Sequence, residues 1–406
     1  MKKIKGGVTA AKGFQAASAA AGIKYQGRTD MALVYTASPA VCAGTFTTNV
    51  VKAAPVQWDM EQVAEKKPVH AVVLNSGIAN ACTGAEGKEV NYFMAAEIAA
   101  QLDVKPEEVL TASTGVIGMQ IAKEPVAKGA ILLKEALADT PEAGRRAAEA
   151  IMTTDTVPKE AAASFEVEGK TVTIGGMSKG SGMIHPNMAT MLSVTTTDAE
   201  IEQELLQEIV REAVDDSFNM ISVDRDTSTN DTYLVLANGE SGVKIQKGTE
   251  ACENFREALN DVATDLAKQM AADGEGCTRL FEVQVLHCRS KEAAKILSKS
   301  VISSNLVKTM IFGKDANCGR ILCALGYAGV DFDPDRVDLT LEAEGEQLVL
   351  VKEGQPVDYS EEKATDLLGR DKVTVYCDMN EGEEAATAWG CDLTYDYVKI
   401  NGDYRS

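Results

Sequence analysis

Histidine is scarce in this chain of 406 residues, and its nine cysteines include no Cys-x-x-Cys pair. The three histidines, His70, His185 and His287, lie far apart in the sequence. A zinc or other His-rich metal centre needs several such ligands at short spacing, so we expect no metal. An odd, dispersed set of cysteines is typical of reduced thiols rather than of a disulfide framework. We interpret neither His70 nor His185 as a catalyst.

Long apolar runs and an excess of positive charge are also lacking. No run approaches the roughly 20 residues of a membrane helix, and the basic start of the chain is broken by glycine and small residues. We therefore expect a cytoplasmic protein without a signal peptide or membrane segment. Forty Lys and Arg against 61 Asp and Glu give a net charge of −21, which repels nucleic acid and anionic membranes.

The length of 406 residues predicts two or three domains, at roughly 150 residues per domain, and hydrophobic periodicity predicts a mixed α/β fold. A buried strand is expected over Val69–Leu74, a helix over Val90–Leu102, and a hairpin over Phe165–Ile174. Asp198 is expected to cap a helix with Ile201 on its apolar face. A further helix is expected over 255–270, and strands over 232–237, 281–285, 337–341, 348–351 and 373–377.

The most unusual segment is GGMSKGSGMIHPNMATML, residues 175–192, which ends in Thr190 just before a strand-like run. It is not a phosphate-binding loop of the Walker type, because Ser181 follows Gly180, and His185 breaks the G-x-G-x-x-G pattern. The segment can deliver a hydroxyl to the start of a strand. The plain alternative is that these glycines only allow a loop to pack tightly.

A second segment, LTASTGVIG at residues 110–118, places Thr114 beside Gly115 after a strand-like entry. A hydroxyl and an unhindered N–H on one turn can form an oxyanion hole, although a simple turn is the alternative. Further polar segments lie between apolar runs and are also candidates, although each taken singly is more typical of a turn or a helix cap. They are 151–159, 222–232, 273–279, 313–321 and the final KINGDYRS.

Together these segments resemble the ornithine acetyltransferases, or glutamate N-acetyltransferases, of arginine biosynthesis. KGSGMIHPNMATML is similar to that family's self-cleavage signature. The family's order along the chain is also kept by NSGIANACTG, TASTGVIG and IMTTDTVPK before it, and by SVDRDTSTNDT, DGEGCTR and NGDYRS after it. The resemblance implies a layered α/β/β/α sandwich with a smaller C-terminal α/β domain. It also implies cleavage between Ala189 and Thr190, which gives an α chain, 1–189, and a β chain, 190–406. Residues 190–280 would complete the sandwich and 281–406 would form the smaller domain, with two of each chain in a heterotetramer.

The resemblance further implies that Thr190 carries an acetyl group from N2-acetyl-L-ornithine to L-glutamate without a cofactor. Acetyl-CoA as a second donor is left open. Thr114 and Gly115 would form the oxyanion hole. The family's substrate-binding positions correspond to Thr153, Lys179, Thr190, Glu275, Asn401 and Ser406. The free α-amine of Thr190 can act as base for its own hydroxyl, which is consistent with the scarcity of histidine.

The chain departs from the family pattern at four positions, and none of them is the nucleophile Thr190. Ile78 replaces an asparagine, Arg225 replaces the glycine of Asp-Gly-Asp, Cys318 stands where tryptophan is common, and Ser406 replaces a threonine. Two alternatives stay open. A hydrolase of the same self-processing superfamily would resolve the acyl-enzyme with water, and a non-catalytic binding protein would remain uncut.

Overall fold

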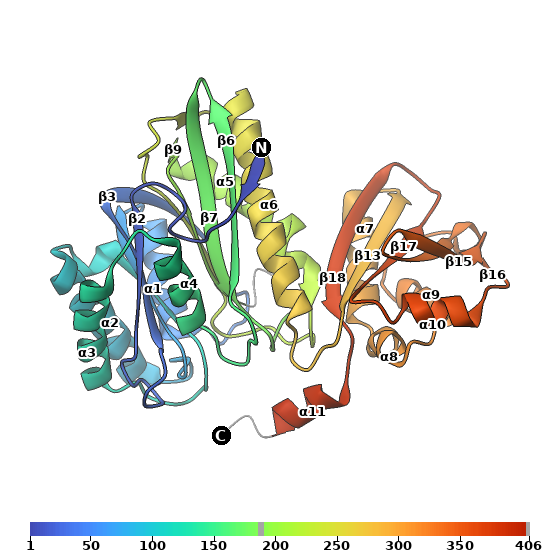
Figure 1. Cartoon of the computed structure of the whole chain (residues 1–406), viewed down its shortest axis with the longest axis horizontal. Helices are drawn as coiled ribbons and strands as arrows, with labels where there is room; N and C mark the ends of the chain where they lie inside the picture. Colours follow the sequence, from blue (N-terminus) through green and yellow to red (C-terminus); the bar gives the residue numbers. More distant parts are fainter. Residues whose placement is uncertain (186–190, 403–406) are drawn as a thin grey trace. The chain divides into compact units, whose positions relative to one another are not determined.

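A computed structural model describes residues 1–185 and 191–402, which divide into two compact units (Figure 1). Unit 1 contains residues 1–180, 191–219 and 227–270, and unit 2 contains residues 181–185, 220–226 and 271–402. Three predicted site residues, Ala189, Thr190 and Ser406, lie outside the described residues. The division into two cleavage products concerns processing and stays a prediction.

The elements of unit 1 are β1 (Lys2–Ile4), β2 (Phe14–Ala19), β3 (Met31–Phe46), α1 (Ala54–Ala64), β4 (Val69–Asn75), α2 (Gly84–Leu102), the 3₁₀ turn η1 (Pro106–Glu108), β5 (Val109–Ser113), α3 (Lys123–Ala136), α4 (Pro141–Ala150), β6 (Lys159–Val167), β7 (Lys170–Lys179), β8 (Leu192–Thr197), β9 (Glu200–Ile201), α5 (Gln203–Asp216), β11 (Thr232–Ala237), β12 (Lys244–Ile245) and most of α6 (Glu250–Ala272). The 3₁₀ turn η2 (Phe218–Met220) spans the point in the sequence where unit 1 ends, at Asn219, and unit 2 resumes, at Met220.

The long strand β3 connects the two halves of the main sheet in unit 1. In the described part of the chain, nine strands form this sheet. Eight of them follow the order β1-β6-β7-β8-β11-β3-β4-β5, and the ninth, β2, pairs with β3. Residues 41–46 of β3 pair with β11, whereas its first residues pair with β2 and β4. One hydrophobic core draws buried side chains from both halves, for example Val34, Val72, Met177 and Leu234.

Helices cover the outer face of each half of this sheet. Helices α2 and α3 pack against the β2-β3-β4-β5 half through residues such as Met94, Ile98 and Val126 (Figure 1). On the other half, α5 is tied to β3 because the Gln207 amide bonds the N–H and the C=O of Gly44. The predicted α/β/β/α order of layers is therefore confirmed.

Most predicted elements of unit 1 are present, with one correction. Val69–Leu74 lies in β4, α2 contains the predicted helix, and the hairpin is β6 and β7, paired from Lys159 opposite Ser178. Asp198, however, caps no helix. Its carboxylate accepts the backbone N–H groups of Thr173 and Lys12, and α5 begins only at Gln203, after the short strand β9.

Unit 2 is built on a second sheet. Its seven strands follow the order β10-β18-β13-β17-β14-β15-β16 within the described residues. Helix α7 packs on β13 and β18. The elements of unit 2 are β10 (Ile221–Ser222), β13 (Leu280–Cys288), α7 (Lys291–Ser303), α8 (Asn305–Gly313), α9 (Cys318–Gly326), η3 (Pro334–Arg336), β14 (Asp338–Ala343), β15 (Glu346–Lys352), β16 (Gln355–Pro356), α10 (Glu361–Leu367), β17 (Lys372–Asp378), β18 (Glu384–Cys391) and α11 (Tyr395–Gly402). The strands predicted after residue 280 are thus confirmed. No helix among the described residues has the length and apolarity to cross a membrane.

Candidate active site

The loop that follows β5 is held as a rigid turn. The Thr114 N–H donates to the carbonyl of Asn75 at 3.0 Å, and the Val116 N–H donates to that of Gly77 at 3.1 Å. Residues 114–116, which we call the Thr114 loop, are therefore bonded to the last residue of β4 and to the segment that follows it. Because β4 and β5 are parallel neighbours, the segments after them leave the sheet at the same edge.

Two asparagines fix the base of the Thr114 loop. The Asn230 amide nitrogen donates to the carbonyls of Ala79 and Ser113 at 2.5 and 2.8 Å, and the Ser113 hydroxyl donates to the Asn75 side chain at 2.7 Å. All four residues are buried. The sequence placed Asn230 in a polar segment without a role, so its anchoring of this loop comes from the structure alone.

Gly115 is required where it stands. Its φ of +132° lies in the region that favours glycine, and a Cβ there would overlap the backbone of Gly77 and Ile78. Within residues 1–185 and 191–402, the Gly115 N–H has no hydrogen-bond acceptor. This N–H is therefore an available donor beside the Thr114 hydroxyl, as an oxyanion hole needs.

Lys179 is brought to the Thr114 loop by the β6–β7 hairpin. It is the last residue of β7 and is buried, and its ammonium donates to the Thr114 hydroxyl oxygen at 3.4 Å. A threonine hydroxyl that accepts a bond from an ammonium still has its own proton to donate. The contact thus leaves the Thr114 hydroxyl able to donate to an acyl oxygen.

Asp155 lies between Lys179 and another predicted site residue, Thr153. Its carboxylate accepts the Thr153 N–H at 3.1 Å and lies 4.0 Å from the Lys179 ammonium. Burial would raise the pKa of the Asp155 carboxyl, but Lys179 and Lys159 lower that pKa to about 2, so Asp155 is ionised at neutral pH. No sequence motif singled out Asp155.

Unit 2 joins two further predicted site residues, Glu275 and Asn401. The Asn401 amide in α11 donates to the Glu275 carboxylate at 2.6 Å, and the Glu275 N–H donates to the carbonyl of Ser181 at 2.9 Å. Glu275 is buried, with 6% of its surface exposed. A buried carboxylate with one amide partner retains acceptor capacity for an amino group.

The segment just before the predicted cleavage site is held by Asp224. This carboxylate accepts the N–H groups of Met183 and Ile184 at 2.6 and 2.8 Å, and the Tyr397 hydroxyl of α11 donates to it at 3.3 Å. The neighbouring Arg225 is exposed and has a φ of +72°, a conformation that glycine adopts without strain. The departure at Arg225 therefore places an arginine where the backbone favours glycine.

Ile78 and Cys318, the other departures within the described residues, lie at different places. Ile78 is buried in the core beneath α2 and bridges to Thr114 and Val116, so this departure borders the Thr114 loop. Cys318 is the first residue of α9 and is half-buried.

The structure thus assembles the predicted site residues in two groups. In unit 1, Lys179 contacts Thr114 beside Gly115, and Thr153 joins through Asp155. In unit 2, Glu275 contacts Asn401. In the part of the chain that the structure describes, no group of three or more His, Cys, Asp or Glu side chains is arranged to hold a metal ion.

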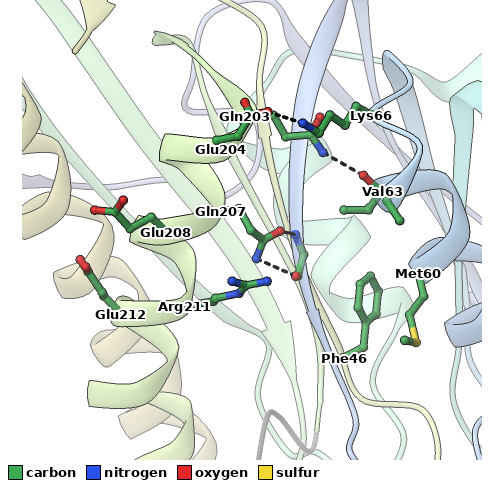
Figure 2. Close-up of a pocket in the computed structure, with 12 residues that line it drawn as sticks. Phe46, Met60, Val63, Lys66, Gln203, Glu204, Gln207, Glu208, Arg211 and Glu212 are labelled. Carbon is green, nitrogen blue, oxygen red and sulfur yellow. Dashed lines mark hydrogen bonds and ion pairs between the residues drawn. The ribbon is translucent and has the colours of Figure 1, made fainter. Parts of the chain in front are cut away.

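A separate groove of about 770 Å³ opens between α1 and α5 and contains none of these residues (Figure 2). Phe46, Met60 and Val63 line one side of it, and α5 contributes Gln203 and Gln207. Both glutamine amides bond backbone groups of unit 1, Gln203 to the carbonyl of Val63 and Gln207 to Gly44. The groove lacks the nucleophile and oxyanion donors that acyl transfer requires, so the site lies elsewhere.

Comparison with known proteins agrees with the segments that carry the resemblance. The model of the ArgJ family matches residues 15–406. The arginine biosynthesis bifunctional protein ArgJ of Symbiobacterium thermophilum is 51% identical over 409 residues, with 100% of both chains covered. The corresponding ArgJ 1 of Clostridium acetobutylicum is 49% identical and covers 97% of this chain and 96% of its own. The crystal structure of ornithine acetyltransferase complexed with ornithine from Mycobacterium tuberculosis is 39% identical, covers 47% of this chain and 99% of its own, and has a TM-score of 0.43.

Proposed function

This chain belongs to the ArgJ family and is a glutamate N-acetyltransferase of arginine biosynthesis, and we propose that it moves the acetyl group of N2-acetyl-L-ornithine to L-glutamate through an acetyl-Thr190 intermediate. The observation that carries the proposal is the pairing of the Thr114 hydroxyl with Lys179, beside the available N–H of Gly115. These groups supply what acyl transfer needs: two donors for an oxyanion and a cation for a substrate carboxylate.

Self-cleavage prepares the nucleophile. The Thr190 hydroxyl oxygen attacks the Ala189 carbonyl carbon, the C–N bond breaks, and the resulting ester is hydrolysed by water. The products are a carboxylate on Ala189 and a free α-amine on Thr190. Because an α-amine has a reference pKa of about 7.7–8.0, it can accept the proton of the Thr190 hydroxyl near neutral pH.

Acetyl transfer then proceeds in two steps on the same oxygen. Thr190 attacks the acetyl carbonyl, and the Thr114 hydroxyl and Gly115 N–H donate to the oxyanion. The intermediate collapses, and ornithine leaves with the proton held by the Thr190 amine. The glutamate amine next attacks the acetyl ester and regenerates Thr190. We assign Lys179 to the substrate carboxylate and Glu275, with Asn401, to the substrate ammonium, while Thr153 and Ser406 complete the binding residues.

No cofactor is needed for this chemistry. The relatives are called bifunctional, and on that ground we propose acetyl-CoA as a second acetyl donor to glutamate. We also propose a cytoplasmic heterotetramer of two α and two β chains, which native mass spectrometry would test.

The proposal is tested first by denaturing mass spectrometry with N-terminal sequencing, followed by transfer assays. Two chains, one beginning Thr190-Met191-Leu192, and N-acetylglutamate formed from N2-acetyl-L-ornithine and glutamate are the expected results. Acetate released at the same rate without glutamate would favour the hydrolase instead. A single uncut, inactive chain would favour the non-catalytic binding protein.

Thr114→Ala is expected to lower kcat for acetyl transfer by about a hundredfold or more, because it removes one oxyanion donor. Steady-state kinetics on chains with confirmed cleavage would measure the effect. Thr171→Ala removes a hydroxyl from the exposed start of β7 and serves as the matched control. A kcat equal to that of the control would show that Thr114 only shapes the turn and does not donate to the oxyanion.

Gly182→Ala is expected to raise the KM for N2-acetyl-L-ornithine about tenfold, since losing one charge-assisted hydrogen bond costs that much or more. A Cβ on residue 182 would overlap the Glu275 carboxylate, which must then leave its place beside Asn401. Gly319→Ala in α9, where a Cβ meets only the Asn317 side chain at 3.4 Å, is the control. Equal KM values for the two variants would argue against contact between Glu275 and the donor.

A further inference from the structure

Both carboxylate oxygens of Asp155 are occupied by groups that belong to, or adjoin, the acyl-transfer residues. One oxygen accepts the Gly180 N–H and the Lys159 ammonium, each at 2.7 Å. The other accepts the Thr153 N–H at 3.1 Å and lies 4.0 Å from the Lys179 ammonium. A single side chain therefore connects the segment before β6 with the end of β7.

The hairpin register explains why a carboxylate is needed at this point. Lys159 begins β6 and pairs with Ser178 of β7, so the register brings Lys159 and Lys179 to the same end of the hairpin. Both ammonium groups are nearly excluded from solvent, with side-chain exposures of 0% and 9%. Two buried like charges repel strongly unless an anion lies between them. Asp155, four residues before Lys159, supplies that anion.

We propose that Asp155 is a positioning residue that holds the Lys179 ammonium toward the Thr114 hydroxyl and the substrate carboxylate. Lys159 forms the shorter ion pair with Asp155, at 2.7 Å, and so fixes the carboxylate in place. Asp155 thus acts on the oxyanion donor through Lys179, without touching the substrate itself. This inference rests on the proposed function of Lys179 and Thr114.

A purely structural role for Asp155 makes a different prediction. If Asp155 only neutralised Lys159, then removing either partner of that ion pair would affect stability and leave transfer kinetics alone. If Asp155 positions Lys179, its removal must also change the protonation and the placement of the Lys179 amine. Lys159→Met and the double variant Asp155→Asn/Lys159→Met separate the two roles, because both lack the Lys159 charge and only the second lacks that of Asp155.

The test compares kcat/KM for acetyl transfer in wild type, Lys159→Met and the double variant, from pH 6 to 9.5, on fully cleaved enzyme. We expect the double variant to lose about tenfold or more in kcat/KM relative to Lys159→Met. The other acidic group that acts on Lys179 is Asp231, and burial raises the pKa of its carboxyl well above the ordinary value. Without the Asp155 charge, the neutral form of the Lys179 amine is favoured, so kcat/KM should also begin to fall at a lower pH on the alkaline side. The double variant keeps no unpaired carboxylate at residue 155, so it should fold.

The outcomes separate this inference from the proposed function. Equal kcat/KM values and equal alkaline limbs in the two variants would overturn the positioning role of Asp155, provided that wild type transfers acetyl. A wild-type enzyme that transfers no acetyl group would instead overturn the proposed function. A tenfold loss together with an alkaline limb at lower pH would support the inference, because a loss of packing that admitted water would favour the charged form of the Lys179 amine and move that limb to higher pH.

Discussion

Thr190→Ala is expected to yield one uncut chain of 406 residues with no measurable acetyl transfer. The same hydroxyl attacks the Ala189 carbonyl during processing and the acetyl carbonyl during turnover, so its removal stops both reactions. Loss of a covalent nucleophile lowers kcat by about 10⁶-fold, which places the variant at the assay background. Intact mass under denaturing conditions and formation of N-acetylglutamate measure the two losses on one sample.

Thr190→Ser is the matched control, because it keeps the hydroxyl and removes only the methyl group. We expect it to give two chains and to retain transfer activity, although at a reduced rate. Cleavage that persists in Thr190→Ala would show that another group or a protease cuts the chain. Transfer that persists in the uncut alanine variant would remove Thr190 from the mechanism altogether.

Local pattern was sufficient to predict much of what positions the site. The apolar run before Asn75 is β4, and the apolar entry before Thr114 is β5. Because the two strands are parallel neighbours, the polar residues after them meet at one edge of the sheet. The Thr114-Gly115 pair was identified from residue chemistry, and the φ of Gly115 supplies a physical reason for the glycine.

Asp155 was missed, although the sequence contained a signal for it. The predicted hairpin turns at Glu168-Gly169, and extending its antiparallel register places Lys159 opposite Ser178, next to Lys179. Two buried lysines at one end of a hairpin require an anion, and Asp155 is the nearest acidic residue before β6. Periodicity alone does not show that both lysines are buried, so the need for the carboxylate became visible only in the structure.

The contacts of Glu275 and Asn230 lay beyond any local pattern. Asn401 is 126 residues from Glu275, and Asn230 is 151 residues from Ala79, so no spacing rule connects them. Only the resemblance pointed to Glu275 and Asn401. The helix predicted to start at Asp198 was misplaced for a similar reason. The Asp198 carboxylate bonds the N–H groups of Thr173 and Lys12, which lie in distant segments, instead of capping a local helix.

Lys159→Met is expected to lower the free energy of unfolding by about 3–5 kcal/mol at pH 7, the usual cost of breaking a fully buried ion pair from one side. The Asp155 carboxylate would lose its 2.7 Å partner and keep the Lys179 ammonium at 4.0 Å. Urea unfolding of wild type and variant would measure the difference. Lys170→Met, at the exposed start of β7, is the control and should change stability by less than about 0.5 kcal/mol.

The pH dependence and the double variant identify the charge as the cause. The pKa of Asp155 is lowered to about 2, so its ion pairs stabilise the fold above its ordinary pKa of 3.8 and are lost as the pH falls toward 2. The difference between wild type and Lys159→Met should therefore shrink from pH 7 to pH 3. Adding Asp155→Asn removes the unpaired carboxylate and should recover part of the lost stability. A variant as stable as wild type at pH 7, or a loss that Asp155→Asn deepens, would show that the pair does not stabilise this end of the hairpin.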